Sequence, residues 1–155
     1  MAEEVEGRIK RLEYLLIDLN GTVALDGEPI SAVAERLTAL SAHLTPYLVT
    51  ADTHGRAAEI AGRLGVRLLR IEGGDEAAQK RALVERLGAE RVVAIGNGAN
   101  DAEMLATAAL GIAVLGPEGL ATAALQAADV VVGCIEDALD LLLRPRRLVA
   151  TLRLG

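Results

Sequence analysis

Polar side chains that could carry out phosphoryl transfer follow an apolar stretch near the start of the chain. The stretch 14–17 is typical of a buried strand, and it ends in Asp18 and the turn Leu19-Asn20-Gly21-Thr22. Taking a carboxylate out of water costs several kcal/mol unless a cation or hydrogen-bond donors meet it. An Asp carboxylate at a strand end can also attack phosphorus and form an aspartyl phosphate. Asp18 is therefore a candidate nucleophile that needs positively charged surroundings.

A hydroxyl and an ammonium group could meet a phosphoryl group at Asp18. The predicted strand 47–50 ends in Thr50, and Lys80 lies in the first turns of a helix predicted over 75–87. Ligands of parallel sheets bind beyond the carboxyl ends of the strands, where we expect both side chains. A hydroxyl and an ammonium can hold phosphoryl oxygens and stabilise charge in the transition state. Lys80 is one of only two lysines, beside fourteen arginines.

A glycine-rich loop, residues 96–101, follows the predicted strand 91–95 and offers oxygen ligands. The Asp101 carboxylate, with Asp18 and a backbone carbonyl, can hold Mg²⁺, which prefers an octahedral oxygen shell and keeps several waters. Gly96 and Gly98 allow the loop to approach the ion closely. Free N–H groups in the turn 19–22 can donate to phosphoryl oxygens.

The elements that position these residues follow from the apolar pattern. Predicted strands alternate with helices of about ten residues, which indicates parallel βαβ units. We predict an α/β fold with a three-layer, Rossmann-like parallel sheet in a single domain over residues 1–155. Asp26-Gly27 predicts a short hairpin flap over 23–29. We expect residues 1–10 to be loosely packed. The basic tail 144–147 is expected to be solvated or to complement a helix dipole, with a contact to a partner as the alternative. The predicted strands are 13–18, 47–50, 66–71, 91–95, 111–115 and 130–132, and the predicted helices begin near residues 31, 55, 75, 101, 118 and 136.

Composition excludes several classes of function. The net charge of −6 argues against nucleic acid or an anionic membrane surface as a partner. No apolar run reaches the roughly 18 residues that a membrane span needs. The acidic N-terminus lacks the features of a signal peptide. A single cysteine, Cys134, excludes an internal disulfide and agrees with a reducing cytoplasm.

The motifs together resemble those of the haloacid dehalogenase-like phosphohydrolases and of the phosphorylation domains of P-type ATPases. The first motif of the phosphatases is Asp-x-Asp-Gly-Thr, and here it reads Asp18-Leu19-Asn20-Gly21-Thr22. The second is a Ser or Thr, here Thr50, and the third is a Lys, here Lys80. The fourth is Gly-Asp-Gly-x-Asn-Asp, here Gly96-Asn97-Gly98-Ala99-Asn100-Asp101. All four occur in order, each at a predicted strand or helix end.

The resemblance implies a role for each matching residue. Asp18, Asn20, Thr50 and Lys80 take the catalytic positions. The expected metal ligands of a Mg²⁺ ion are Asp18, Asn20, Asn97 and Asp101. The expected phosphate-binding residues are Leu19, Gly21, Thr22, Thr50, Ala51, Lys80 and Asn100.

Two positions depart from the phosphatase pattern. The phosphatases have a general acid/base Asp where this chain has Asn20, which can give only its backbone carbonyl to the metal. General acid–base catalysis typically raises the rate about 10²–10⁴-fold, so turnover without it is expected to be slow. The usual metal-binding Asp is Asn97 here, a neutral and weaker ligand. Either Asn97 still binds the ion, or Asp101 takes over, or metal binding is weak.

The spacing of the motifs leaves no room for a cap domain, because ordinary βα units fill the intervals from Thr22 to Thr50 and from Thr50 to Lys80. The resemblance implies that such members have open sites, act on large substrates, or close their sites by forming homo-oligomers. The first hypothesis is a slow, Mg²⁺-dependent phosphatase acting on a phosphorylated small molecule or macromolecule. The alternatives are a non-catalytic, phosphate-binding regulatory module and a nucleotide-binding α/β protein with coincidental motifs.

Overall fold

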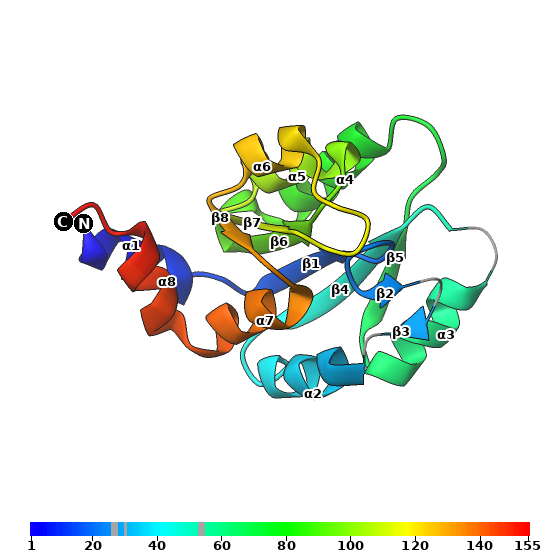
Figure 1. Ribbon diagram of the computed structural model, residues 1–155, viewed down its shortest axis with the longest axis horizontal. Helices are drawn as coiled ribbons and strands as arrows, with labels where there is room; N and C mark the ends of the chain where they lie inside the picture. Colours follow the sequence, from blue (N-terminus) through cyan, green and yellow to red (C-terminus); the bar gives the residue numbers. More distant parts are fainter. Residues whose placement is uncertain (26–27, 30, 53–54) are drawn as a thin grey trace.

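A six-stranded sheet forms the centre of the protein. The computed structural model describes residues 1–25, 28–29, 31–52 and 55–155. The strand order is β5-β4-β1-β6-β7-β8, and every neighbouring pair is parallel (Figure 1). This confirms the predicted parallel α/β fold. The strands are β1 (Tyr14–Asp18), β4 (Thr45–Thr50), β5 (Arg67–Arg70), β6 (Val92–Gly96), β7 (Leu110–Val114) and β8 (Val130–Val132).

The central strands are apolar on both faces because helices cover both sides of the sheet. In β1, Leu15 and Ile17 belong to one hydrophobic cluster, and Leu16, which points the opposite way, belongs to a second. All three side chains are fully buried. A parallel sheet buried on both faces requires such continuous apolar strands, which explains the uninterrupted runs in the sequence.

Helices on both faces of the sheet form the two outer layers. Helices α4 (Glu76–Leu87), α5 (Ala102–Thr107) and α6 (Thr122–Ala127) lie above the sheet in Figure 1. Helices α2 (Ser31–Leu40), α3 (Arg56–Leu64) and α7 (Ile135–Leu143) lie below it. Two short 3₁₀ helices, η1 (Ala89–Arg91) and η2 (Ala99–Asp101), flank β6. The arrangement is the predicted three-layer, Rossmann-like one.

The strand order changes direction at β1, which creates a crevice at the sheet edge. The chain passes from β1 to β4 and β5 on one side, then returns to place β6 on the other side of β1. Asp18 is level with Val49, and Ile17 is level with Ile95. The three strands therefore end together, and ligands of open α/β sheets bind at such a switch point.

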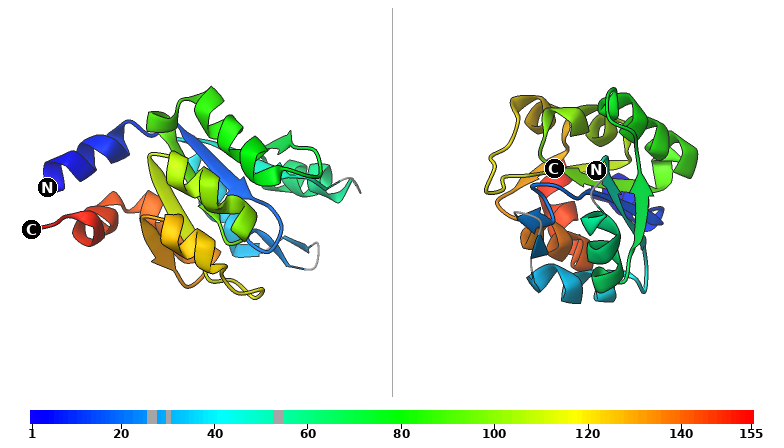
Figure 2. Two further views of the ribbon diagram at one scale, coloured as in Figure 1. Left: turned by 90° about the horizontal axis from the view of Figure 1, so that it is seen from above. Right: turned by 90° about the vertical axis from the view of Figure 1, so that its right-hand side faces the viewer.

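The two ends of the chain differ from the sequence-based expectation. Residues 1–10, predicted to be loosely packed, form helix α1 (Ala2–Lys10). Residues 144–147 are exposed, as predicted, but they also lie at the start of a helix that was not predicted, α8 (Pro145–Leu152). The two helices pack together beside the sheet, with both termini close to each other (Figures 1 and 2). Val5 and Leu148 are buried there. Proline is favoured at the first position of a helix, so Pro145 begins α8 rather than preventing it.

The predicted hairpin flap is present as the antiparallel pair β2 (Ala24–Leu25) and β3 (Glu28–Pro29). Its predicted turn, Asp26-Gly27, lies outside the described residues. The pair follows directly after the turn 19–22, so it lies next to the candidate nucleophile in sequence.

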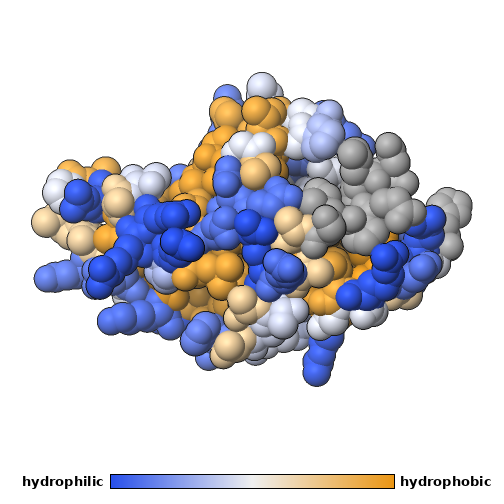
Figure 3. All heavy atoms as spheres, turned by 60° about the horizontal axis from the view of Figure 1, so that its bottom comes forward, coloured by the Kyte–Doolittle hydropathy of each residue, from blue (hydrophilic) through white to orange (hydrophobic). Residues whose placement is uncertain are grey.

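The surface mixes polar and apolar side chains. On the face shown in Figure 3, hydrophilic and hydrophobic residues are interspersed. None of the helices in the described part of the chain has both the length and the apolar character needed to cross a bilayer.

Candidate active site

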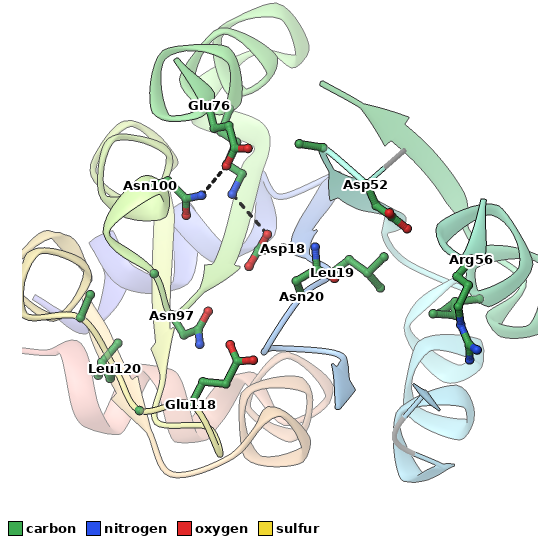
Figure 4. Close-up of a pocket in the computed structure, with 16 residues that line it drawn as sticks. Asp18, Leu19, Asn20, Asp52, Arg56, Glu76, Asn97, Asn100, Glu118 and Leu120 are labelled. Carbon is green, nitrogen blue, oxygen red and sulfur yellow. Dashed lines mark hydrogen bonds and ion pairs between the residues drawn. The ribbon is translucent and has the colours of Figure 1, made fainter. Parts of the chain in front are cut away.

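The candidate site is a cavity of about 940 Å³ beyond the carboxyl ends of β1, β4 and β6 (Figure 4). Most residues that the sequence singled out are brought together here. Those that line the cavity are Asp18, Leu19, Asn20, Ala51, Lys80, Asn97 and Asn100. The other predicted residues do not line the cavity, but each is hydrogen-bonded to a lining residue or adjacent to one in sequence. They are Gly21, Thr22, Thr50 and Asp101.

Lys80 joins the first and fourth motifs. Its Nζ donates to Asp18 Oδ1 at 3.2 Å and to Asp101 Oδ1 at 2.9 Å. The Lys80 side chain is 3% exposed, so a positive charge is held in a largely dry setting between two carboxylates. A buried charge requires paired, hydrogen-bonded partners, so these contacts hold the three side chains together. Helix α4 thus supplies the cation that the buried end of β1 requires.

The glycine-rich loop is built around the Asp101 carboxylate. Asp101 is fully buried, and its Oδ2 accepts hydrogen bonds from the backbone N–H groups of Asn97 and Gly98, both at 3.0 Å. A side chain at Gly96 would overlap with the same carboxylate. Glycine at position 96 is therefore needed for the approach of Asp101. One Asp101 oxygen accepts a hydrogen bond from Lys80 and the other accepts from the loop, so Asp101 orients both Lys80 and the loop.

The hydroxyl of Thr50 lies between the ends of β1 and β4. Thr50 is 1% exposed, and its Oγ1 accepts a hydrogen bond from the Asp52 N–H at 3.0 Å. The Asn20 side-chain amide donates to the same oxygen at 3.3 Å. The side chain of Asn20 is thus turned toward Thr50, on the β4 side of Asp18.

On the other side of Asp18, the first motif contacts the fourth. Thr22 Oγ1 donates to the Asn97 side-chain oxygen at 3.2 Å, and both residues are buried. In Figure 4 the Asn97 side chain points into the cavity from the end of β6, facing Asp18. The Asn100 amide instead donates to Glu76 Oε2 at 2.6 Å, at the start of α4.

The surroundings of Asp18 oppose its ionisation. The pKa of Asp18 is raised from its ordinary value of 3.8 to about 7. Burial is the largest cause, the nearby Asp101 charge also raises the pKa, and Lys80 partly offsets both. Burial by itself lowers the pKa of Lys80, but the Asp18 and Asp101 carboxylates outweigh it, so that the pKa is raised. Lys80 therefore stays charged, and metal-free Asp18 changes its charge near neutral pH.

We expect the stability gained on replacing Asp18 by Asn to depend on pH. Between about pH 4 and pH 7 the folded metal-free protein binds more protons at Asp18 than the unfolded chain, so its stability falls as pH rises. The amide of the Asp18→Asn variant has no such titration. Urea unfolding in chelator should show the advantage of Asp18→Asn over the natural protein growing by roughly 2 kcal/mol from about pH 5 to pH 8. A constant or shrinking difference would contradict this assignment.

Oxygen donors that fit a magnesium ion surround Asp18, although few of them are charged. Within the described residues, no group of three or more His, Cys, Asp or Glu side chains is placed to hold a metal. Mg²⁺ is commonly bound by one or two carboxylates together with neutral oxygens and waters. Asp18, the Asn20 carbonyl and the Asn97 amide form a donor set of this kind. Their role as metal ligands stays a prediction.

Besides Asp52, which follows β4, three charged residues of the cavity were not predicted from sequence. Arg56 begins α3, Glu76 begins α4, and Glu118 lies in the segment between β7 and α6; all three line the cavity. Each lies near the carboxyl end of a strand, which was the available signal. Loops carry many charged residues, however, so position in the sequence could not separate these three from solvated ones.

Comparison with known proteins agrees with this geometry. Residues 2–109 match the family model of the haloacid dehalogenase-like hydrolases. An uncharacterized protein of Methanocaldococcus jannaschii, MJ0073, is 45% identical over 84 residues, which cover 52% of this chain and 90% of that protein.

Two solved structures share the fold. The 3-deoxy-D-manno-octulosonate 8-phosphate phosphatase of Moraxella catarrhalis, in complex with magnesium, phosphate and KDO, has a TM-score of 0.74 and 18% identity over 97% of this chain and 99% of that chain. The cobalt-bound deoxy-D-mannose-octulosonate 8-phosphate phosphatase of Haemophilus influenzae has a TM-score of 0.72 and 15% identity over 90% of this chain and 92% of that chain.

Proposed function

Because this chain belongs to the haloacid dehalogenase-like hydrolases, we propose that it is a phosphatase that hydrolyses phosphoric monoesters through an aspartyl phosphate on Asp18. The observation that carries the proposal is the buried Lys80, which bridges Asp18 and Asp101 at the wall of an open cavity. A purely structural ion pair would have no need to lie at the edge of such a cavity.

In the first step, a carboxylate oxygen of Asp18 attacks phosphorus, and the bond from phosphorus to the ester oxygen breaks. The Lys80 ammonium contacts Asp18, and the Thr50 hydroxyl contacts Asn20. Both groups would hold the phosphoryl oxygens as negative charge develops. The backbone N–H groups of residues 20–22 and of Ala51 would donate to the same oxygens. The Leu19 N–H, which was expected to do so as well, donates instead to the Val49 carbonyl at 3.1 Å. The leaving alcohol takes its proton from water, because Asn20 has none to give.

In the second step, water attacks the phosphorus of the aspartyl phosphate, inorganic phosphate leaves, and the Asp18 carboxylate is restored. A carboxylate at position 20 would accept the proton of this water, whereas the Asn20 amide cannot. We therefore expect slow release of phosphate and accumulation of the phosphorylated protein.

The residues that would hold Mg²⁺ are Asp18, the backbone carbonyl of Asn20 and the side-chain oxygen of Asn97. When bound, the ion would neutralise charge on the phosphoryl oxygens. We assign Asp101 a positioning role for Lys80 and the loop, because both of its oxygens are occupied within the protein. The magnesium and phosphate in the Moraxella catarrhalis phosphatase support a magnesium requirement.

The substrate is proposed to be a phosphorylated small molecule or an exposed phosphate of a larger one. The two similar solved structures are phosphatases of a phosphorylated sugar acid, which supports the first choice. The cavity also carries Arg56 on its wall, opposite the Asp18 turn in Figure 4, where an anionic part of a substrate would be attracted.

The test is hydrolysis of p-nitrophenyl phosphate by the purified protein, with Mg²⁺ and with excess chelator. We expect slow release of phosphate that requires Mg²⁺. The alternative function is a phosphate-binding module without turnover, which is favoured by the amides at positions 20 and 97. Calorimetric titration with Mg²⁺ and beryllofluoride tests this alternative. Tight binding without any hydrolysis would favour that alternative, and absence of both would contradict the two functions together.

A further inference from the structure

A short turn between β7 and α6 carries a carboxylate to the metal-binding side of the cavity. Residues 116–119 form the turn, in which Gly116 and Gly119 exchange backbone hydrogen bonds of 3.4 and 2.9 Å. Gly119 has a φ of +89°, which favours glycine at this position. Two residues further on, the Ala121 N–H donates to the Asn97 carbonyl at 2.9 Å. The turn is thus attached to the residue that replaces the usual metal-binding Asp.

Two glycines allow this turn to pack against the first motif. A Cβ atom at Gly116 would lie only 2.9 Å from the Gly21 carbonyl oxygen. A Cβ atom at Gly21 would overlap with the Glu118 carboxylate and lie 3.1 Å from Asn97 Nδ2. Gly21, Asn97 and Glu118 therefore meet around one point. Figure 4 shows the Glu118 carboxylate beside Asn97, on the side of the cavity away from Glu76.

The predicted cation has few negatively charged ligands, and the Glu118 carboxylate could supply another. The proposed ligands include only one charged group, Asp18, and the Lys80 ammonium offsets charge on both Asp18 and Asp101. The other acidic residue of the lining on the α4 side, Glu76, accepts the Asn100 hydrogen bond. Asp101 contacts the Asn97 backbone, whereas Glu118 lies beside the Asn97 side chain, where the amide takes the place of a charged carboxylate.

We propose that Glu118 contributes a carboxylate oxygen to the ligands of the divalent cation and so replaces the charge that Asn97 lacks. The inference rests on the proposed function, because that function places the cation between Asp18 and Asn97. It accounts for glycine at position 21, where a Cβ atom would occupy the space that the Glu118 carboxylate fills. Hard cations such as Mg²⁺ favour such charged oxygen ligands.

Calorimetric titration of the metal-free protein with Mg²⁺ tests the proposal without relying on activity. We expect Glu118→Gln, which keeps the shape and removes the charge, to weaken Mg²⁺ binding at least about tenfold. Glu6→Gln, which makes the same change on the exposed face of α1, should bind like the natural protein. Adding Asn97→Asp to Glu118→Gln should recover most of the lost affinity, since it returns the charge beside the same point. Urea unfolding of each variant would verify that the fold is intact.

The outcomes separate this proposal from the function on which it rests. Equal Mg²⁺ affinity of Glu118→Gln and the natural protein would overturn the role of Glu118, while Mg²⁺-dependent hydrolysis would still support the phosphatase. Failure of Asn97→Asp to recover Mg²⁺ binding would also contradict the role of Glu118, because the two positions would then not bind the same ion. No Mg²⁺ binding by the natural protein would overturn both.

Discussion

Replacing Asp18 by Asn should reduce hydrolysis of p-nitrophenyl phosphate by at least about 10³-fold, because the amide cannot attack phosphorus. The variant keeps the size of the side chain, and Lys80 keeps its 2.9 Å contact with Asp101, so we expect the fold to remain. Rates measured at saturating Mg²⁺, with the rate in chelator subtracted, would give the loss directly.

The control for the Asp18 variant is Asp137→Asn. It makes the same change on the exposed first turn of α7, away from the cavity. Its rate should equal that of the natural protein. A comparable rate for Asp18→Asn and the natural protein would show that the hydrolysis comes from another group, or from a contaminating phosphatase.

Replacing Asn20 by Asp should raise turnover by about 10²-fold, since general acid–base catalysis is typically worth about 10²–10⁴-fold. The position is suited to this role: Asn20 lines the cavity directly after the Asp18 strand, and its side chain reaches Thr50 at 3.3 Å. A carboxyl there could give a proton to the leaving oxygen and later take one from the attacking water. The measurement is kcat with p-nitrophenyl phosphate across neutral pH.

The matched control for Asn20→Asp is Asn20→Ala. It removes the hydrogen bond to Thr50 without supplying an acid, so it should leave turnover unchanged or lower it. An equal gain in both variants would mean that the Asn20–Thr50 contact, rather than the missing acid, limits the rate. If Asn20→Asp does not raise kcat, the missing acid/base carboxyl is not what limits turnover.

The core of the fold could be predicted from the sequence because its signals are local. Apolar runs such as 14–17 end at glycine or polar residues, and Gly65 ends α3 with a φ of +69°. Helix α1 was missed because its nine residues contain only scattered apolar positions, and its burial depends on contact with α8 at the opposite end of the chain. No helix was predicted after residue 143, although Pro145 begins α8, the helix that α1 needs as a partner.

The candidate site was predictable where residue type and strand end coincide. Asp18 and Thr50 satisfy both conditions. Lys80 lies instead in the first turns of α4, and the structure brings it to Asp18, while Thr50 contacts the adjacent Asn20. Glu118 does not satisfy them, because its place beside Gly21 depends on two loops that are far apart in sequence and meet only in the folded chain. The same holds for Asp101, whose contacts with Lys80 and two backbone N–H groups cannot be deduced from spacing alone.

The most direct measurement is the mass of the protein after rapid acid quenching of its reaction with p-nitrophenyl phosphate and Mg²⁺. Because Asn20 should slow the release of phosphate, we expect a large fraction of the protein to carry one phosphoryl group, mapped by peptide analysis to Asp18. The Asn20→Asp protein should carry less, and the Asp18→Asn protein none. A protein that hydrolyses the ester in Mg²⁺ yet shows no phosphorylated Asp18, even in the natural Asn20 form, would contradict the proposed mechanism.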